Sequence, residues 1–180
     1  LIPLSEPYTA LGYTSFTNGA GASIAPSVLN ATGDDAIIDW IIVELRNSSN
    51  PGTIVASKPA LVEADGDVMS TDGVTPILGT FTPGTYYVAI HHRNHLAVMT
   101  DNAMDITGVV DMSVEPLFGT GAAMTVNGVR VLWPGDTSGN KQIQYTGSGN
   151  DKDIILTAVG GNTPNNQLTN TYAQTDVNMD

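Results

Sequence analysis

The sequence predicts a mainly β protein, in which an antiparallel β-sandwich, immunoglobulin-like or transthyretin-like, is followed by a small C-terminal loop–helix segment. Valine, isoleucine and threonine dominate its apolar runs, and these β-branched residues favour strands. Turn residues recur about every ten residues, which is the spacing of strands in a sandwich. After Trp133 the composition shifts to Gly, Asn, Asp and Thr. We therefore predict a sandwich domain over residues 1–133 and a separate segment over residues 134–180.

The strongest expected strand covers residues 37–46, where Ile41, Val43 and Leu45 would share one face. A turn is expected over residues 47–52, because Asn, Ser, Pro and Gly are concentrated there. The remaining strands are expected at 53–57, 74–81, 85–91 and 123–133. The core is expected to contain Ile41, Val43, Leu45, Tyr86 or Tyr87, Ile90 and Val131.

Two regions outside these strands also have recognisable patterns. Residues 11–33 are rich in Gly, Ala, Ser and Thr, and are expected to form a long exposed connection or an edge. Residues 151–159 are expected to form a helix, because acidic residues occupy its first turn and Gly160-Gly161 would end it.

The charge balance excludes several classes of partner. The chain has 18 acidic and 6 basic residues among 180, so its net charge is −12. Binding to nucleic acid or to an anionic membrane surface requires clusters of Lys and Arg that this chain lacks.

Cysteine is absent, which excludes disulfides, zinc–thiolate sites and cysteine nucleophiles. No nucleophile elbow, phosphate loop or zinc-protease motif is present, so we expect a non-enzymatic protein.

The segment that begins at Asp136 has the ligand spacing of a calcium-binding loop. Asp136, Ser138 and Asn140 place side-chain oxygens at its first, third and fifth positions, and the carbonyl of Gln142 follows. Ca²⁺ takes about six to eight oxygen ligands, and a tight loop turns alternate side chains inward. We therefore predict that these four residues bind calcium.

This loop departs from the usual pattern at two positions. Its sixth residue is Lys141 instead of Gly, and its twelfth is Gly147 instead of an acid. We expect the inserted residues to loop out, so that Asp153 completes the site; an ordinary Asn- and Gly-rich turn is the alternative. The same spacing begins again near the C-terminal end, with ligands expected at Asp176, Asn178 and Asp180.

Longer motifs extend over most of the chain. Those at 133–136, 144–156, 160–161 and 176–180 resemble the dockerin-like calcium repeats found in large exported surface proteins of the phylum Bacteroidota. Those at 39–40, 43–46, 65–67 and 86–96 resemble the β-sandwich domain that accompanies these repeats. The resemblance implies a bacterial cell-surface location, export by the type IX pathway and calcium as the cofactor.

We also expect the chain to act within a larger assembly. The second calcium loop stops at Asp180 before it is complete, and the apolar segment at residues 1–4 suits packing against another chain or domain. Residues 11–33 would leave backbone groups unpaired unless another segment covered them, as in strand addition between subunits. The expected partners are copies of the same chain or adjoining domains of a longer surface protein, of which this chain is a mature subunit or a fragment.

Other residue groups leave alternatives open. His91, His92 and His95 could form a transition-metal site with Asp65 or Asp67, although hydrogen bonding at a strand end is the favoured interpretation. Asp65 and Asp67, with Asp72, could also hold a second calcium ion, although an ordinary hairpin connection is favoured. The aromatic residues could form a sugar-binding platform instead of core; they are Tyr8, Tyr13, Trp40, Tyr86, Tyr87 and Trp133.

These observations lead to one principal function and two alternatives. We expect an extracellular structural or adhesive protein, a subunit or repeat of a surface filament, fibre or adhesin that calcium stiffens. One alternative is a carbohydrate-binding module of an exported multidomain hydrolase, with surface glycans as ligands and an exposed row of aromatic residues. The other is a metal hydrolase that uses His92 and His95 with a carboxylate.

Overall fold

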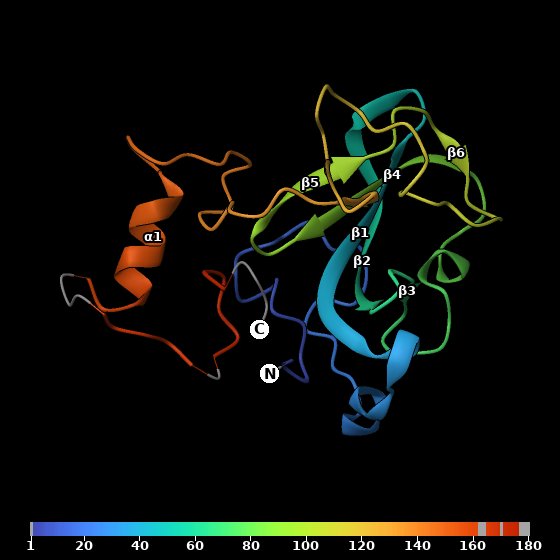
Figure 1. The fold of residues 1–180 in the computed structure, drawn as a ribbon. Coiled ribbons are helices and arrows are strands. Elements are labelled where there is room, and N and C mark those ends of the chain that lie inside the picture. Colours follow the sequence, from blue (N-terminus) through green and yellow to red (C-terminus); the bar gives the residue numbers. More distant parts are fainter. Residues whose placement is uncertain (1, 162–164, 170, 177–180) are drawn as a thin grey trace.

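The computed structural model describes residues 2–161, 165–169 and 171–176, and confirms a mainly antiparallel β architecture with one short α-helix (Figure 1). One sheet has the strand order β3-β2-β1-β4-β5, and β6 pairs with β4. A separate hairpin joins β7 to β8. The strands are β1 (Ile37–Asn47), β2 (Asn50–Glu63), β3 (Val68–Met69), β4 (Thr85–His92), β5 (His95–Met99), β6 (Met104–Asp105), β7 (Met124–Val126) and β8 (Val129–Val131). The immunoglobulin-like or transthyretin-like assignment and the boundary at residue 134 remain predictions.

Strand β1 lies at the centre of the sheet and is buried on both faces. Ile41, Val43 and Leu45 point to one face, as expected, and form a first core cluster with Ala60, Ile77, Phe81, Val88 and Ile106. Trp40 and Ile42 belong to a second core cluster with Tyr8, Ile24, Ile37 and Leu61. A strand covered on both faces has apolar residues at successive positions, which explains the almost uninterrupted apolar run of β1.

The N-terminal segment, which includes η1 (Pro26–Asn30), supplies much of the second core cluster. The hydroxyl of Tyr8 donates to the carbonyl of Trp40 at 2.6 Å, and the indole N–H of Trp40 donates to the carbonyl of Pro3 at 2.9 Å. Ile24 is buried, and Ile2 packs against the same cluster. The expectation that residues 11–33 form an exposed connection or an edge is therefore wrong in part, because this segment also covers a face of the sheet.

Three expected strands differ from the structure. Residues 74–81 contain the 3₁₀-helix η3 (Ile77–Thr80) instead of a strand, because Ile77 and Phe81 turn into the first core cluster. Residues 123–133 form the β7–β8 hairpin, in which Asn127 and Gly128 both have positive φ, the backbone that a two-residue hairpin turn requires. Its Val131 is only partly buried and belongs to neither cluster. The strand expected at 53–57 is part of the longer β2.

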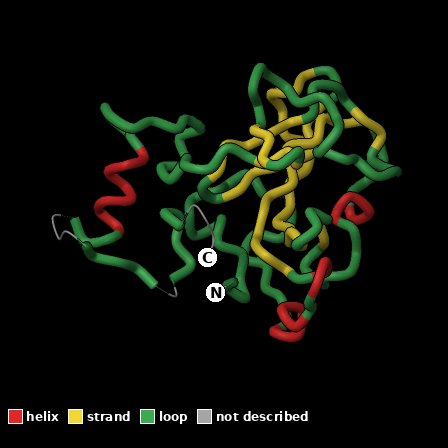
Figure 2. Tube along the Cα trace, in the orientation of Figure 1, coloured by secondary structure: helices red, strands yellow, loops and turns green. Residues whose placement is uncertain are grey.

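After β8 the chain runs mostly as loops, apart from α1 (Asp151–Ala158), which lies to one side of the sheet (Figure 2). The helix at this position and its end before Gly160-Gly161 were expected from the sequence. Strand β5 holds the start of this segment, because the N–H of Leu96 donates to the carbonyl of Trp133 at 2.9 Å. Within the described part of the chain, no helix has the length and apolar character needed to cross a membrane.

Candidate metal centre

The loop from residue 136 to residue 151 is closed by a carboxylate at each end. Asp136 and Asp151 are 5% and 4% exposed, respectively. One oxygen of Asp151 accepts from the N–H of Ser138 at 3.0 Å, and the other accepts from the N–H of Gln144 at 2.7 Å. Asp136 accepts from the N–H of Lys141 at 2.9 Å. The backbone therefore curls around the two carboxylates.

The expected side-chain ligands are only partly brought together. The hydroxyl of Ser138 lies 3.4 Å from a carboxylate oxygen of Asp136, so these two oxygens are neighbours. Asn140 instead uses its amide N–H₂ on the carbonyl of Gly149 and its amide oxygen on the N–H of Gln142, both at 2.9 Å. Lys141, at the position where calcium loops favour Gly, has φ 69°, so the left-handed turn forms despite the side chain.

Asp153, the acid expected to complete the site, lies in the first turn of α1 and takes part in capping the helix. Asn150 is the N-cap residue: its amide oxygen accepts from the N–H of Asp153 at 2.9 Å, and its amide N–H₂ donates to the Asp153 carboxylate at 2.9 Å. Asp151, two residues earlier, is the acid whose carboxylate reaches the loop. Sequence reasoning missed Asp151, although its place directly after the N-cap residue Asn150 was a usable signal.

The electrostatic environment of the two carboxylates differs. Burial, together with the charge of Asp151, raises the pKa of Asp136 above its ordinary value. Burial acts on Asp151 in the same direction, but the N–H groups of Gln144 and Ser138 outweigh it and lower the pKa of that carboxyl. Two neighbouring carboxylates and a hydroxyl offer hard oxygen ligands, and a bound divalent cation would remove the unfavourable interaction between the two charges.

The tail that follows α1 returns to the sheet at a buried anchor formed by Asp39, Arg93 and Tyr172. The guanidinium of Arg93 forms an ion pair with Asp39, and both side chains are 2% exposed. The hydroxyl of Tyr172 donates to the other oxygen of Asp39 at 2.5 Å, and its ring lies 4.0 Å from the guanidinium carbon. Arg93 Nε also donates to the carbonyl of Ala173 at 3.1 Å. These contacts fix the tail on the sheet.

Asn94, which is fully buried, connects the starts of both expected calcium loops. Its carbonyl accepts from the N–H of Gly135 at 2.9 Å, directly before Asp136. Its side-chain amide donates to the carbonyl of Asp176 at 2.5 Å. Asp176 is therefore placed beside the β4–β5 turn, whereas the other two expected ligands of the second loop, Asn178 and Asp180, lie outside the described residues.

His91 and His92 lie beside different carboxylates, and His95 contacts His92. His91 Nε2 lies 3.0 Å from Glu44, and His92 Nε2 lies 3.0 Å from Asp39. The Nδ1 atoms of His92 and His95 are 2.9 Å apart, so one histidine of the pair at 91–92 meets His95, as alternation along a strand predicts. Among the described residues, neither Asp65 nor Asp67 joins a three-ligand metal group with these histidines.

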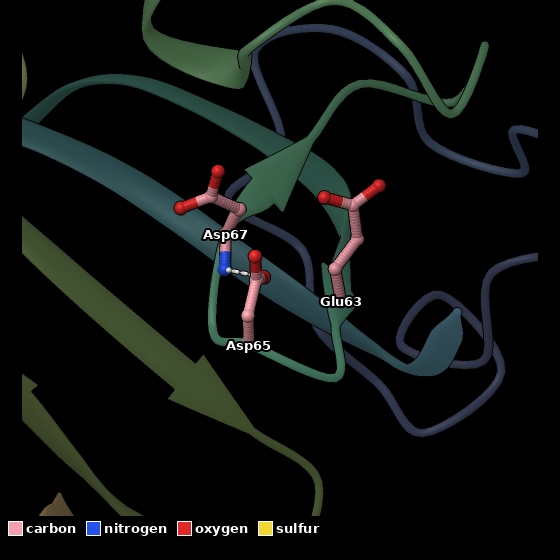
Figure 3. A group of neighbouring side chains, drawn as sticks. All are labelled: Glu63, Asp65 and Asp67. Atoms are coloured by element: carbon pink, nitrogen blue, oxygen red, sulfur yellow. Dashed lines mark hydrogen bonds between the residues drawn. The ribbon is translucent and has the colours of Figure 1, made fainter. Parts of the chain in front are cut away.

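Asp65 and Asp67 instead lie with Glu63 at the turn between β2 and β3 (Figure 3). One carboxylate oxygen from each residue lies within 4.8 Å of the others, so this group could hold a metal ion. The turn is also a regular hairpin connection, as expected, because the N–H of Glu63 donates to the carbonyl of Asp67 at 2.9 Å.

The aromatic residues divide between core and surface. Trp40 and Tyr8 are buried in the second core cluster. Tyr13 packs against Phe16 and donates its hydroxyl to Glu44 at 2.6 Å. Trp133 is 39% exposed, and its indole N–H donates to the carbonyl of Gly121. This distribution favours core packing over a sugar-binding platform.

Comparison with known proteins yields no match to a family, a curated protein or a solved structure. The resemblance to Bacteroidota surface proteins therefore remains a prediction from the motifs in the sequence.

Proposed function

We propose that this chain is a non-enzymatic structural or adhesive module of an extracellular, cell-surface protein, and that calcium stiffens the attachment of its C-terminal segment. The observation that carries the proposal is the loop closed by Asp136 and Asp151, two buried carboxylates around which the backbone curls. Calcium would give this loop-rich segment the stability that its small apolar content cannot provide.

The contacts of the tail with the sheet support the same proposal. The candidate loop begins one residue after the hydrogen bond between Gly135 and Asn94, and the chain returns to the sheet at Tyr172. A cation bound in this loop would therefore fix a segment whose two ends are both held on a rigid sheet. That arrangement suits a protein that transmits force or maintains a spacing between domains, in the predicted immunoglobulin-like or transthyretin-like sandwich.

A carbohydrate-binding module is the second candidate. Its support is the exposure of Tyr145, which is 75% accessible, and of Trp133 on the C-terminal segment. The structural proposal is preferred because Trp40 and Tyr8, the aromatic residues of the second core cluster, cannot stack on a sugar. Partners are proposed to be copies of this chain or adjoining domains of a longer surface protein.

We expect calcium to raise the melting temperature of the protein, and Asp151→Asn to reduce that rise. The amide keeps the size of the side chain but removes the charge that a cation needs. Calcium at about a hundredfold excess over its dissociation constant stabilises a folded state by about 2.7 kcal/mol per site. Differential scanning calorimetry with calcium and with chelator measures this effect, and Asp101→Asn, at an exposed acid, is the matched control. An equal rise in wild type and D151N would contradict the loop site.

The cellular location is tested separately. Antibodies raised against the chain should label intact cells of the source organism as strongly as permeabilised cells, because a surface protein is accessible from outside. Labelling that appears only after permeabilisation would contradict the extracellular assignment, whatever the calorimetry shows.

A further inference from the structure

The carboxylate of Glu63 is unusual among the acidic side chains of the described residues. Glu63 is the last residue of β2 and is 3% exposed. Its backbone is fully engaged in the hairpin, since its N–H donates to Asp67 and its carbonyl accepts from Gly66. Within the described part of the chain, its carboxylate forms no hydrogen bond and no ion pair. The side chain is therefore buried while its carboxylate keeps a small contact with solvent, and a carboxylate in such a place is unfavourable without a partner.

The surroundings of Glu63 add negative charge instead of compensating it. Asp65 and Asp67 are exposed and direct their carboxylates to the same side of the turn (Figure 3). Asp35, at the end of η2 (Gly33–Asp35), adds a further negative charge. The ion pairs formed by basic side chains of the described residues all lie elsewhere, on Glu44, Asp39 and Asp153. Burial and these neighbouring acids raise the pKa of Glu63.

The turn itself is held firmly. The N–H of Ala64 donates to the carbonyl of Ala36 at 2.9 Å, and the N–H of Asp65 donates to the carbonyl of Asp34 at 3.3 Å. The N–H of Asp67 donates to a carboxylate oxygen of Asp65 at 3.0 Å. The three acidic side chains therefore project from a fixed backbone, so their proximity is built into the fold and not the product of a mobile loop.

We propose that the β2–β3 turn is a cation site, in which the carboxylates of Glu63, Asp65 and Asp67 bind one calcium ion. Two oxygens bonded to one cation at about 2.4 Å lie at most about 4.8 Å apart, and the oxygens of these three carboxylates lie within 4.8 Å of one another. The two exposed residues would capture the ion from solvent, and Glu63 would supply the inner ligand. The site is independent of the loop at residues 136–151 and of the proposed function.

The test counts calcium ions bound to the full chain. Wild type, Glu63→Gln, the double variant Asp65→Asn with Asp67→Asn, and the control Asp101→Asn are equilibrated with about 1 mM calcium, a concentration suited to extracellular sites. Bound calcium is measured by equilibrium dialysis. We expect each of the first two variants to bind one ion fewer per chain than wild type, and D101N to bind the same number. Far-UV circular dichroism checks folding, which the exposed double variant should retain.

Two results would overturn the proposal. If E63Q and the double variant bind as much calcium as wild type, these three carboxylates do not hold the ion. Wild type that binds no calcium would also reject the site. Adding D151N separates the two proposals: if E63Q loses an ion and D151N does not, the hairpin site stands and the loop at residues 136–151 does not bind calcium.

Discussion

Replacing Asp39 by Ala is expected to lower the free energy of unfolding by about 3–5 kcal/mol, because the guanidinium of Arg93 would remain buried without its counter-charge. The same substitution removes the acceptor of Tyr172 and a partner of His92. Typical domains have only about 5–15 kcal/mol of stability, so the variant should be close to unfolding at moderate temperature. Urea denaturation measures the change.

The control is Asp101→Ala, which removes an exposed carboxylate and should change stability by less than about 0.5 kcal/mol. Limited proteolysis provides a second readout, because D39A should expose the tail at residues 171–176 to cleavage before the sheet unfolds. A loss of stability below about 1 kcal/mol, with the tail still protected, would show that the ion pair does not anchor the tail.

Acidification from about pH 6.5 to pH 4 is expected to destabilise the protein through His95. Burial, with nearby His92 and Arg93, lowers the pKa of His95 from 6.5 to about 4. The unfolded chain therefore takes up this proton at a higher pH than the folded chain does. The contribution of His95 to the free energy of unfolding is therefore fully present above about pH 6.5. It decreases by up to about 3 kcal/mol as the pH falls to 4.

The variant His95→Gln should flatten this part of the pH profile. Glu44 should still produce a second loss of stability at lower pH: although burial opposes it, the neighbouring His91 and the hydrogen bond from Tyr13 lower the pKa of Glu44 from 4.5 to about 2. Its contribution is complete above about pH 4.5 and disappears towards pH 2. Urea titrations at several pH values measure both effects. A wild-type profile that stays level between pH 6.5 and 4 would contradict the assignment to His95.

The elements that depend on local sequence patterns could be predicted from the sequence. β1, β4 and α1 occur close to the expected positions, since a long apolar run, a Pro83-Gly84 turn and a capped acidic helix start are short-range signals. Ile41, Val43 and Leu45 lie on one face of the sheet for the same reason. The apolar residues at the alternate positions, Trp40 and Ile42, were an unused signal that the opposite face is covered as well.

The covering segments could not be predicted, because irregular backbone has no period. Nothing in residues 11–33 shows that Ile24 packs near Trp40, and nothing in residues 74–81 shows that Ile77 and Phe81 turn into the core. The anchor of the tail depends on sequence separations of 54 residues for Arg93 and 133 for Tyr172, measured from Asp39. Such pairings arise from the tertiary fold and leave no mark in local spacing.

The position of the candidate loop was predictable, but not every side chain that gathers there; calcium binding remains a prediction. The alternation of side chains along the loop correctly predicted that the oxygens of Asp136 and Ser138 are neighbours. The choice between Asp151 and Asp153 depended on where the helix begins, and Asn150 decides it by capping. Both acids lie in the first turn of α1, but they are two residues apart and therefore point about 200° apart around the helix axis. This two-residue difference decides which acid reaches the loop.

The two hydrogen bonds of Asn94 have a mechanical consequence. They hold Gly135 and Asp176 on the same residue, so the chain between them, including α1, leaves the sheet and returns to it at one point. Tension applied at Asp176 would pass through Asn94 and the nearby contacts of Arg93 and Tyr172 into the β4–β5 hairpin and β1. The helix and the candidate loop would bear no load until those contacts break. Once they break under tension, the chain between Gly135 and Asp176 would extend in a single step.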